Sequence, residues 1–250
     1  MTENSSSETL APLDSFMKNM EELETIIAVY SHLSANPLIN PENPEGRAYD
    51  IDILIKSAIV FIVTCWDEFI KQLVEYAFNF MLTNAYDSDV FPIQVKMIAS
   101  EKLSSKPMTE SWKKDIWRLA GDGWKEVLKD NKEEIINKFH TPRADIIDKL
   151  LLHVIGLKNL SHEWKWDTIT VANSRKCLDI LMNLRGDIVH QNKPHRKVTM
   201  DDIEYFSLLV NKLAGISANI VRKYVYEQTD EYPWTDNNIL GVAYDDSHCQ

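Results

Sequence analysis

The sequence predicts an all-α fold built as an antiparallel helical bundle, and three observations lead to this prediction. The chain has 250 residues and is 44% hydrophobic, which is enough to bury a core. It contains only 7 Gly and 9 Pro, so long helices with few turns are favoured over a many-turned sandwich or barrel. Apolar residues recur with the helical period, and no segment alternates convincingly with period two.

Two long helices are expected first. A helix over about residues 8–33 ends at "SANPLINPENPEG", whose prolines mark a loop. A second helix over about 47–82 carries an apolar stripe that indicates burial along its length, made of Ile51, Ile55, Ile59, Ile62, Trp66, Phe69, Leu73 and Phe80.

Shorter helices are expected over 92–103, 109–130 and 131–139, followed by one in which Thr141 is the N-cap and Pro142 the first helical residue. A loop at "LKNLSHEWKWD" precedes a helix over 168–190. Thr199 then caps a last long helix to about 227, with Asp202 completing a capping box. The expected division is an acidic N-terminal helix with a Pro-rich loop (1–45), a helical domain (46–227) and an acidic tail (228–250).

Charge is unevenly distributed. The net charge is −11, but residues 1–56 carry 10 acids and 3 bases, and residues 227–250 carry 6 acids and no Lys or Arg. The middle of the chain is therefore nearly neutral. The acidity argues against tight non-specific nucleic-acid binding, yet RNA can still be bound by a local basic patch.

A soluble, cytoplasmic protein without membrane contact is expected. The longest apolar run, Ser57–Trp66, is too short to span a bilayer, and "MTENSSSETL" lacks the features of a signal peptide. The three cysteines, Cys65, Cys177 and Cys249, are odd in number and far apart, which fits neither a disulfide framework nor a zinc site and favours a reducing compartment.

The segment "NLRGDIVHQNKPHRK" breaks two local rules at the end of a predicted helix. Gly186 costs such a helix about 1 kcal/mol relative to Ala. Asp187 places a negative charge near the negative end of the helix dipole. The buried seam of this helix is expected to hold Cys177, Leu181, Leu184 and Ile188. Sequences tend to break local rules at functional sites or element ends.

The polar residues of this segment suggest phosphate chemistry. Arg185 offers a permanently charged fork that matches phosphate oxygens. His190 can exchange a proton at neutral pH, and Asp187 could orient either residue. The basic turn that follows, with Lys193, His195, Arg196 and Lys197, could contact an RNA backbone. In a regular helix Arg185 and His190 lie about 140° apart, so convergence would require the helix to loosen at Gly186 or a second subunit to contribute.

The segment "NLRGDIVHQN" resembles the Arg-x4-His signature of HEPN domains, and the chain from about 47 to 226 resembles the RiboL-PSP-HEPN-like branch of that superfamily. The segment "FIVTCWDEFIKQLVEYAF" is similar to the first core helix of that branch. The resemblance implies a HEPN-type bundle with extra helices and an N-terminal helical extension.

The resemblance also implies a function, because such proteins are commonly metal-independent endoribonucleases that act as homodimers, with the Arg and His of both subunits at the two-fold interface. It makes Arg185 the group that stabilises the phosphoryl charge and His190 the acid or base, with no cofactor or metal. Glu68, then Asp67, are the expected supporting acids. Asn192 is a further expected supporting residue; it stands where nucleotidyltransferase-paired members carry a modified Tyr, so regulation by that modification is not expected. Toxin–antitoxin or phage-defence roles follow, with an antitoxin or sensor protein as a possible partner.

Other interpretations stay open at this point. Arg185 and His190 could simply favour the carbonyl end of a helix. The chain could be a non-catalytic helical dimer that binds RNA or a protein, or a metal-dependent phosphohydrolase. The remaining histidines, among them His140 and His162, are scattered, and no pair has the spacing of a helical metal site. They are expected to be ordinary surface or core residues.

Overall fold

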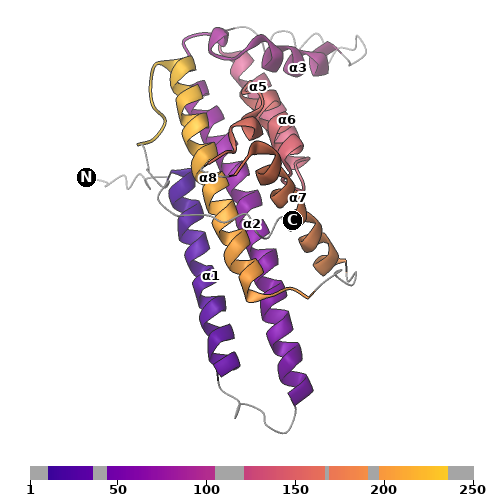
Figure 1. Cartoon of the computed structure of the whole chain (residues 1–250). Helices are drawn as coiled ribbons and strands as arrows, with labels where there is room; N and C mark the ends of the chain where they lie inside the picture. The colour runs from indigo at the N-terminus through magenta and orange to yellow at the C-terminus, as the bar shows by residue number, and fades with distance from the viewer. Residues whose placement is uncertain (1–10, 36–43, 105–120, 167–168, 191–196, 236–250) are drawn as a thin grey trace, which may run out of the picture.

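The computed structural model describes residues 11–35, 44–104, 121–166, 169–190 and 197–235. These residues form the predicted all-α bundle (Figure 1). Helices α1 (Pro12–Ala35), α2 (Pro44–Asn84) and α8 (Met200–Thr229) are long rods. The shorter helices are α3 (Ile93–Ser104), α5 (Gly123–Asn137), α6 (Ala144–Val154) and α7 (Val171–Val189), with 3₁₀ turns at η1 (Ser88–Val90) and η2 (Leu160–Glu163).

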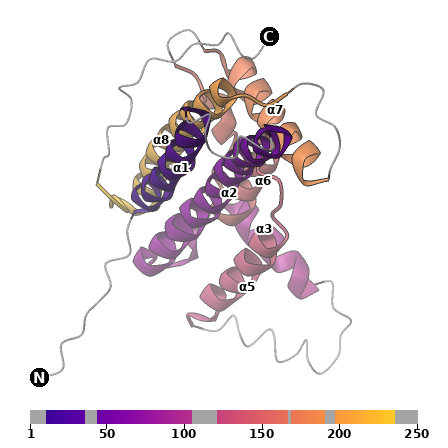
Figure 2. The same cartoon turned by 90° about the horizontal axis from the view of Figure 1, so that it is seen from below.

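Helix α2 is the centre of the bundle, since it packs against α1, α8, α7 and α6. Figure 2 shows α1 and α8 side by side on one flank of α2, with α6, α3 and α5 on the other flank. The stripe predicted from the sequence faces the core: Ile59, Ile62 and Trp66 are fully buried. Helix α2 therefore supplies both the core of the bundle and one wall of the site described below.

Helix α1 belongs to the same hydrophobic core. Its residues Leu13, Phe16, Met20 and Leu23 are buried, and the Phe16 ring lies 5.1 Å from that of Phe69 on α2. The sequence places this helix outside the helical domain, but its apolar face is covered by α2 and α8. That division into domains stays a prediction.

Most expected helices are present, and the differences arise where tertiary packing overrides the local sequence signals. The predicted capping box is confirmed, because the Thr199 backbone N–H donates to Asp202 Oδ2 at 2.8 Å. The predicted break between 130 and 131 is wrong: α5 continues through Asn131, because Val127, Leu128, Asn131 and Lys132 form one continuous buried face. The part of the expected 109–130 helix before residue 121 lies outside the described residues.

The start of α6 also differs from the prediction. Thr141 does not cap α6, and Pro142 is not helical; the helix begins at Ala144, with Arg143 at the N-cap.

Cys177 is disulfide-bonded, which the cysteine count did not predict, whereas Cys65 is a free, buried thiol. No helix in the described part of the chain combines the length and the apolar character needed to cross a bilayer.

Candidate active site

A cavity of about 950 Å³ lies where α2, the turn before α6 and the end of α7 meet. Three separate parts of the chain supply its polar lining: Thr64 and Asp67 from α2, His140, Thr141 and Arg143 from the turn, and Asn183, Arg185, Asp187 and His190 from α7 and its end. The three predicted catalytic residues, Arg185, Asp187 and His190, therefore border one space. That space also contains a second arginine and a second histidine.

Helix α7 keeps its regular geometry as it reaches the cavity. Thr170 caps its start by accepting a hydrogen bond from the Asn173 backbone N–H at 3.2 Å. At its end, the His190 backbone N–H still donates to the Gly186 carbonyl at 3.0 Å. The helix does not loosen at Gly186, and Arg185 and His190 nevertheless both line the cavity. Met182, Gly186 and His190 are spaced by four residues, so the cavity lies along one face of α7 and reaches the C-cap of the helix.

Gly186 is not required by the packing of the bundle. A Cβ atom added there would meet no other atom within 4 Å, and the backbone is ordinary helix. Neither a close approach nor a left-handed conformation explains this glycine. Its position on the cavity wall leaves open space next to Arg185 and Asp187.

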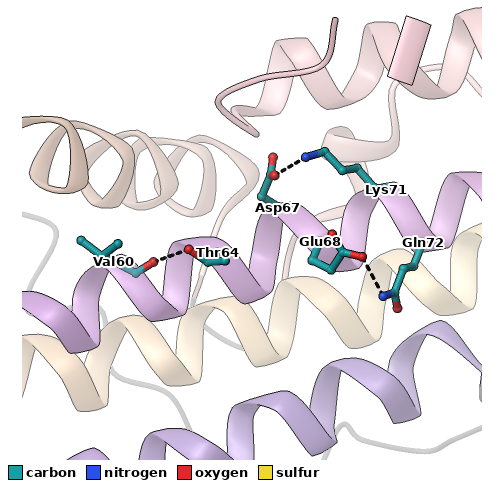
Figure 3. A network of polar contacts seen from close by, with 6 residues as sticks. All are labelled: Val60, Thr64, Asp67, Glu68, Lys71 and Gln72. Carbon is teal, nitrogen blue, oxygen red and sulfur yellow. Dashed lines mark hydrogen bonds and ion pairs between the residues drawn. The ribbon is translucent and has the colours of Figure 1, made fainter. Parts of the chain in front are cut away.

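The two acids considered on α2 point in different directions (Figure 3). Asp67 lines the cavity, and its Oδ2 accepts a hydrogen bond from Lys71 Nζ. Glu68 is exposed, accepts from Gln72 Nε2 at 2.9 Å, and does not line the cavity. The geometry thus favours Asp67 over Glu68, the reverse of the order expected from the sequence, because neighbouring helix positions face different sides.

Asp67 also carries an unsatisfied atom. Its Oδ1 is buried and has no hydrogen-bond partner among the described residues. A buried acceptor without a partner costs free energy, so such an atom usually receives a donor from water or a ligand.

The turn before α6 carries backbone strain. Thr141 has a φ of 59° although its side chain is β-branched and exposed. Non-glycine residues rarely adopt this left-handed conformation, and it is especially unfavourable for β-branched ones. The strained turn presents His140 and Arg143 to the cavity.

Hydrogen bonds from two helices hold this turn in place. Trp66 Nε1 on α2 donates to the Pro142 carbonyl at 3.1 Å. The Arg143 guanidinium donates to Asp179 Oδ1 at 2.8 Å and to Asn183 Oδ1 at 2.6 Å, both on α7. Strain of this kind persists where the surroundings over-determine the conformation, which is common at functional sites. Nothing local in the sequence links His140 and Arg143 to Arg185 and His190, so their place on the same cavity was not predictable.

Several predicted residues do not join the described cavity. Asn192, Lys193, His195 and Arg196 lie outside the described residues. Lys197 is exposed and does not line the cavity. Their predicted supporting and RNA-binding roles stay predictions.

The described residues offer neither a metal-binding cluster nor a reactive thiol at this cavity. Among the described residues, no group of three or more His, Cys, Asp and Glu side chains is arranged to hold a metal ion. Next to Trp66, burial raises the pKa of the Cys65 thiol to about 11, with a smaller contribution from Glu22. This thiol is therefore protonated at neutral pH and is not a candidate nucleophile.

The fold and the cavity together define an all-α protein with an Arg- and His-lined site at the end of a bundle helix. The family model RiboL-PSP-HEPN matches residues 18–224, and the chain belongs to this family. The match begins inside α1, further toward the N-terminus than the resemblance seen in the sequence, and it includes every residue that lines the cavity. No curated protein and no solved structure matches the chain. HEPN domains are often ribonucleases, so membership points to an RNA-related function.

Proposed function

We propose that this protein is a metal-independent endoribonuclease that cleaves RNA by attack of a ribose 2′-OH on the adjacent phosphorus. The observation that carries the proposal is the shared cavity, in which Arg185, Asp187 and His190 lie beside Asp67. The bond from the 2′ oxygen to phosphorus forms as the bond to the 5′ oxygen breaks. The products are a 2′,3′-cyclic phosphate and a free 5′-OH end.

Each residue has a role that its chemistry supports. Arg185 is permanently charged and stabilises the negative charge that develops on the phosphoryl oxygens. His190, exposed at the end of α7, transfers a proton to or from the reacting oxygens. Asp187, one helical position after Gly186, orients the bound nucleotide or His190. Asp67 lines the cavity and places a carboxylate beside the reacting groups.

A homodimer is part of this proposal, and an apolar groove beside the cavity supports it. Its apolar lining is Ile53, Val60, Phe61 and Ile188, with Lys56 and Ser57 beside them, and it shares Thr64 with the cavity. Ile53 is 42% exposed, although it lies on the central helix of the bundle. An apolar surface next to a polar cavity is typical of an interface that places a second subunit at the site.

The enzymatic proposal is tested by the purified protein and four variants. The wild-type protein should cleave a labelled single-stranded RNA in the presence of EDTA, and its products should end in a cyclic phosphate. Arg185→Ala and His190→Ala should each abolish this cleavage. Arg175→Ala, on the same helix, and His162→Ala, in η2, are matched controls because neither residue lines the cavity. If the wild-type protein cleaves no RNA with or without metal, the proposal is wrong.

The dimer is tested separately by sedimentation. Ile53→Asp should shift the protein toward monomer, because a charge in an apolar interface is costly. Ile93→Asp is the control, since Ile93 is 59% exposed on α3, at the opposite end of the bundle (Figure 1). A monomeric wild-type protein would contradict the dimer.

The resemblance to HEPN proteins supports a biological role as a toxin or phage-defence effector restrained by an antitoxin or sensor. Expression in a bacterial host should arrest growth, and Arg185→Ala should relieve the arrest. The alternative function is a non-catalytic helical dimer that binds RNA or a protein. The solvent-exposed His190 and the open cavity favour catalysis over that alternative. RNA binding that survives both alanine substitutions, without any cleavage by the wild type, would support the alternative instead.

A further inference from the structure

We propose that the turn from His140 to Arg143 is the second half of the active site, with His140 as a second proton-transfer residue that shares acid and base duties with His190. This inference rests on the proposed ribonuclease function. It is carried by one observation: both histidines and both arginines line the same cavity, although they come from different parts of the chain.

The reaction itself requires two proton-transfer groups. One must accept the proton of the 2′-OH as the new bond to phosphorus forms. The other must donate a proton to the 5′ oxygen as the old bond breaks. Within one subunit, the predicted pair Arg185 and His190 contains a single histidine. His140 supplies a second histidine to the same cavity from the same subunit.

The charged groups around the cavity suit a phosphodiester. Arg185 and Arg143 are the cations, from α7 and the turn, and Asp67 and Asp187 are the anions, from α2 and α7. Arg143 is already held by Asp179 and by the neutral Asn183. Its planar fork is therefore fixed before substrate binds, and it positions the phosphate rather than transferring a proton.

His140 combines accessibility with a rigid mounting. Its side chain is exposed at the cavity, so it can exchange protons with solvent between turnovers. Its neighbours are fixed: Phe139 is buried in the core, and the Pro142 carbonyl accepts from the buried Trp66 indole. The left-handed backbone at Thr141 lies between these anchors. Strain maintained in an exposed turn is explained if the turn must aim His140 and Arg143 at one point.

The test compares two histidine variants on two substrates. On a dinucleotide such as UpA, His140→Gln and His190→Gln should each lower kcat/KM by roughly 10²- to 10⁴-fold. On uridine 3′-(4-nitrophenyl phosphate), the leaving group is a stable phenolate that departs without a proton. The variant that has lost the acid should therefore recover most of its activity, while the variant that has lost the base should not.

The pH profile provides a readout that a structural role would not change. Wild-type kcat/KM should follow a bell-shaped dependence on pH, and each histidine variant should lose one limb. Added imidazole should partly rescue His140→Ala. His162→Gln is the matched control, because His162 is an exposed histidine outside the cavity, and this variant should behave as wild type.

The outcomes separate this inference from the proposed function. If the wild type cleaves RNA and His190→Gln is inactive, but His140→Gln keeps its rate and both limbs, the turn is not part of the catalytic apparatus. If both variants lose activity equally on both substrates, the division of acid and base duties is wrong. If the wild type does not cleave RNA at all, the proposed function fails and this inference fails with it.

Discussion

Replacing Gly186 with alanine should stabilise the protein, although the residue borders the candidate active site. Glycine in a helix is less stable than alanine by about 0.5–1 kcal/mol. An added Cβ would contact nothing within 4 Å, so no steric cost offsets this gain. For a chain of this size, a change of about 1 kcal/mol shifts the melting temperature by roughly 2–4 °C. We therefore expect Gly186→Ala to melt about 1–4 °C higher than the wild type.

The assay is thermal unfolding followed by far-UV circular dichroism, together with urea unfolding at one temperature. Ala28→Gly is a matched control, because Ala28 is exposed within α1 and the reverse substitution there should cost a similar amount. A lower melting temperature for Gly186→Ala would refute the reasoning. It would mean that Gly186 packs closely against a neighbour, such as a second subunit. A higher melting temperature with reduced RNA cleavage would show that the glycine is kept for the site rather than for the fold.

Three further predictions address the strained turn, the buried Cys65 and the half-buried Tyr224. Thr141→Asn should stabilise the fold by up to about 1 kcal/mol in urea unfolding, because Asn tolerates the left-handed backbone; destabilisation would mean that the Thr141 side chain makes a needed contact. In the native protein, Cys65 should resist iodoacetamide at neutral pH, since it is buried and its pKa is raised to about 11; peptide mass mapping should find it alkylated only after unfolding. Burial likewise raises the pKa of Tyr224 from 10.0 to about 12, and its hydroxyl donates to the Ile155 carbonyl. The unfolded chain therefore loses this proton first, so the contribution of Tyr224 to stability is present below pH 10 and is lost as the pH rises through about 12. Tyr224→Phe should consequently lose less stability than the wild type over that interval, and equal losses would contradict the assignment.

The helices were predictable because their apolar residues repeat regularly along the chain. The stripe on α2 and the cap at Thr199 depend on local spacing, which the sequence displays directly. The errors fall where tertiary contacts override local preference. Asn131 looks like a helix boundary, yet it is 2% exposed within α5 because the buried face continues past it. Thr141 looks like an N-cap, but hydrogen bonds between the turn and helices α2 and α7 hold the turn in another conformation.

The candidate site was predictable on α7 and, in part, on α2, where Asp67 was the second choice of supporting acid. Arg185, Asp187 and His190 lie within one short motif, and all three line the cavity. The choice between Asp67 and Glu68 depends on how α2 is rotated about its axis, which the sequence did not determine. His140 and Arg143 are brought to the cavity by hydrogen bonds to Trp66, Asp179 and Asn183. Those contacts link residues far apart in sequence, and no local pattern reveals them.

Two departures from backbone preference, at Thr141 and Gly186, border the same cavity. The Thr141 side chain is exposed and Gly186 faces open space, so close side-chain packing explains neither, although hydrogen bonds to α2 and α7 hold the turn at Thr141. Each costs stability of about 1 kcal/mol, a noticeable share of the few kcal/mol that keep a domain folded. Backbone conformations that lower stability without improving the packing are tolerated where function requires them. Because Thr141 and Gly186 belong to different segments, the turn and α7, they support the proposal that the functional unit is the whole cavity and not the Arg-x4-His motif alone.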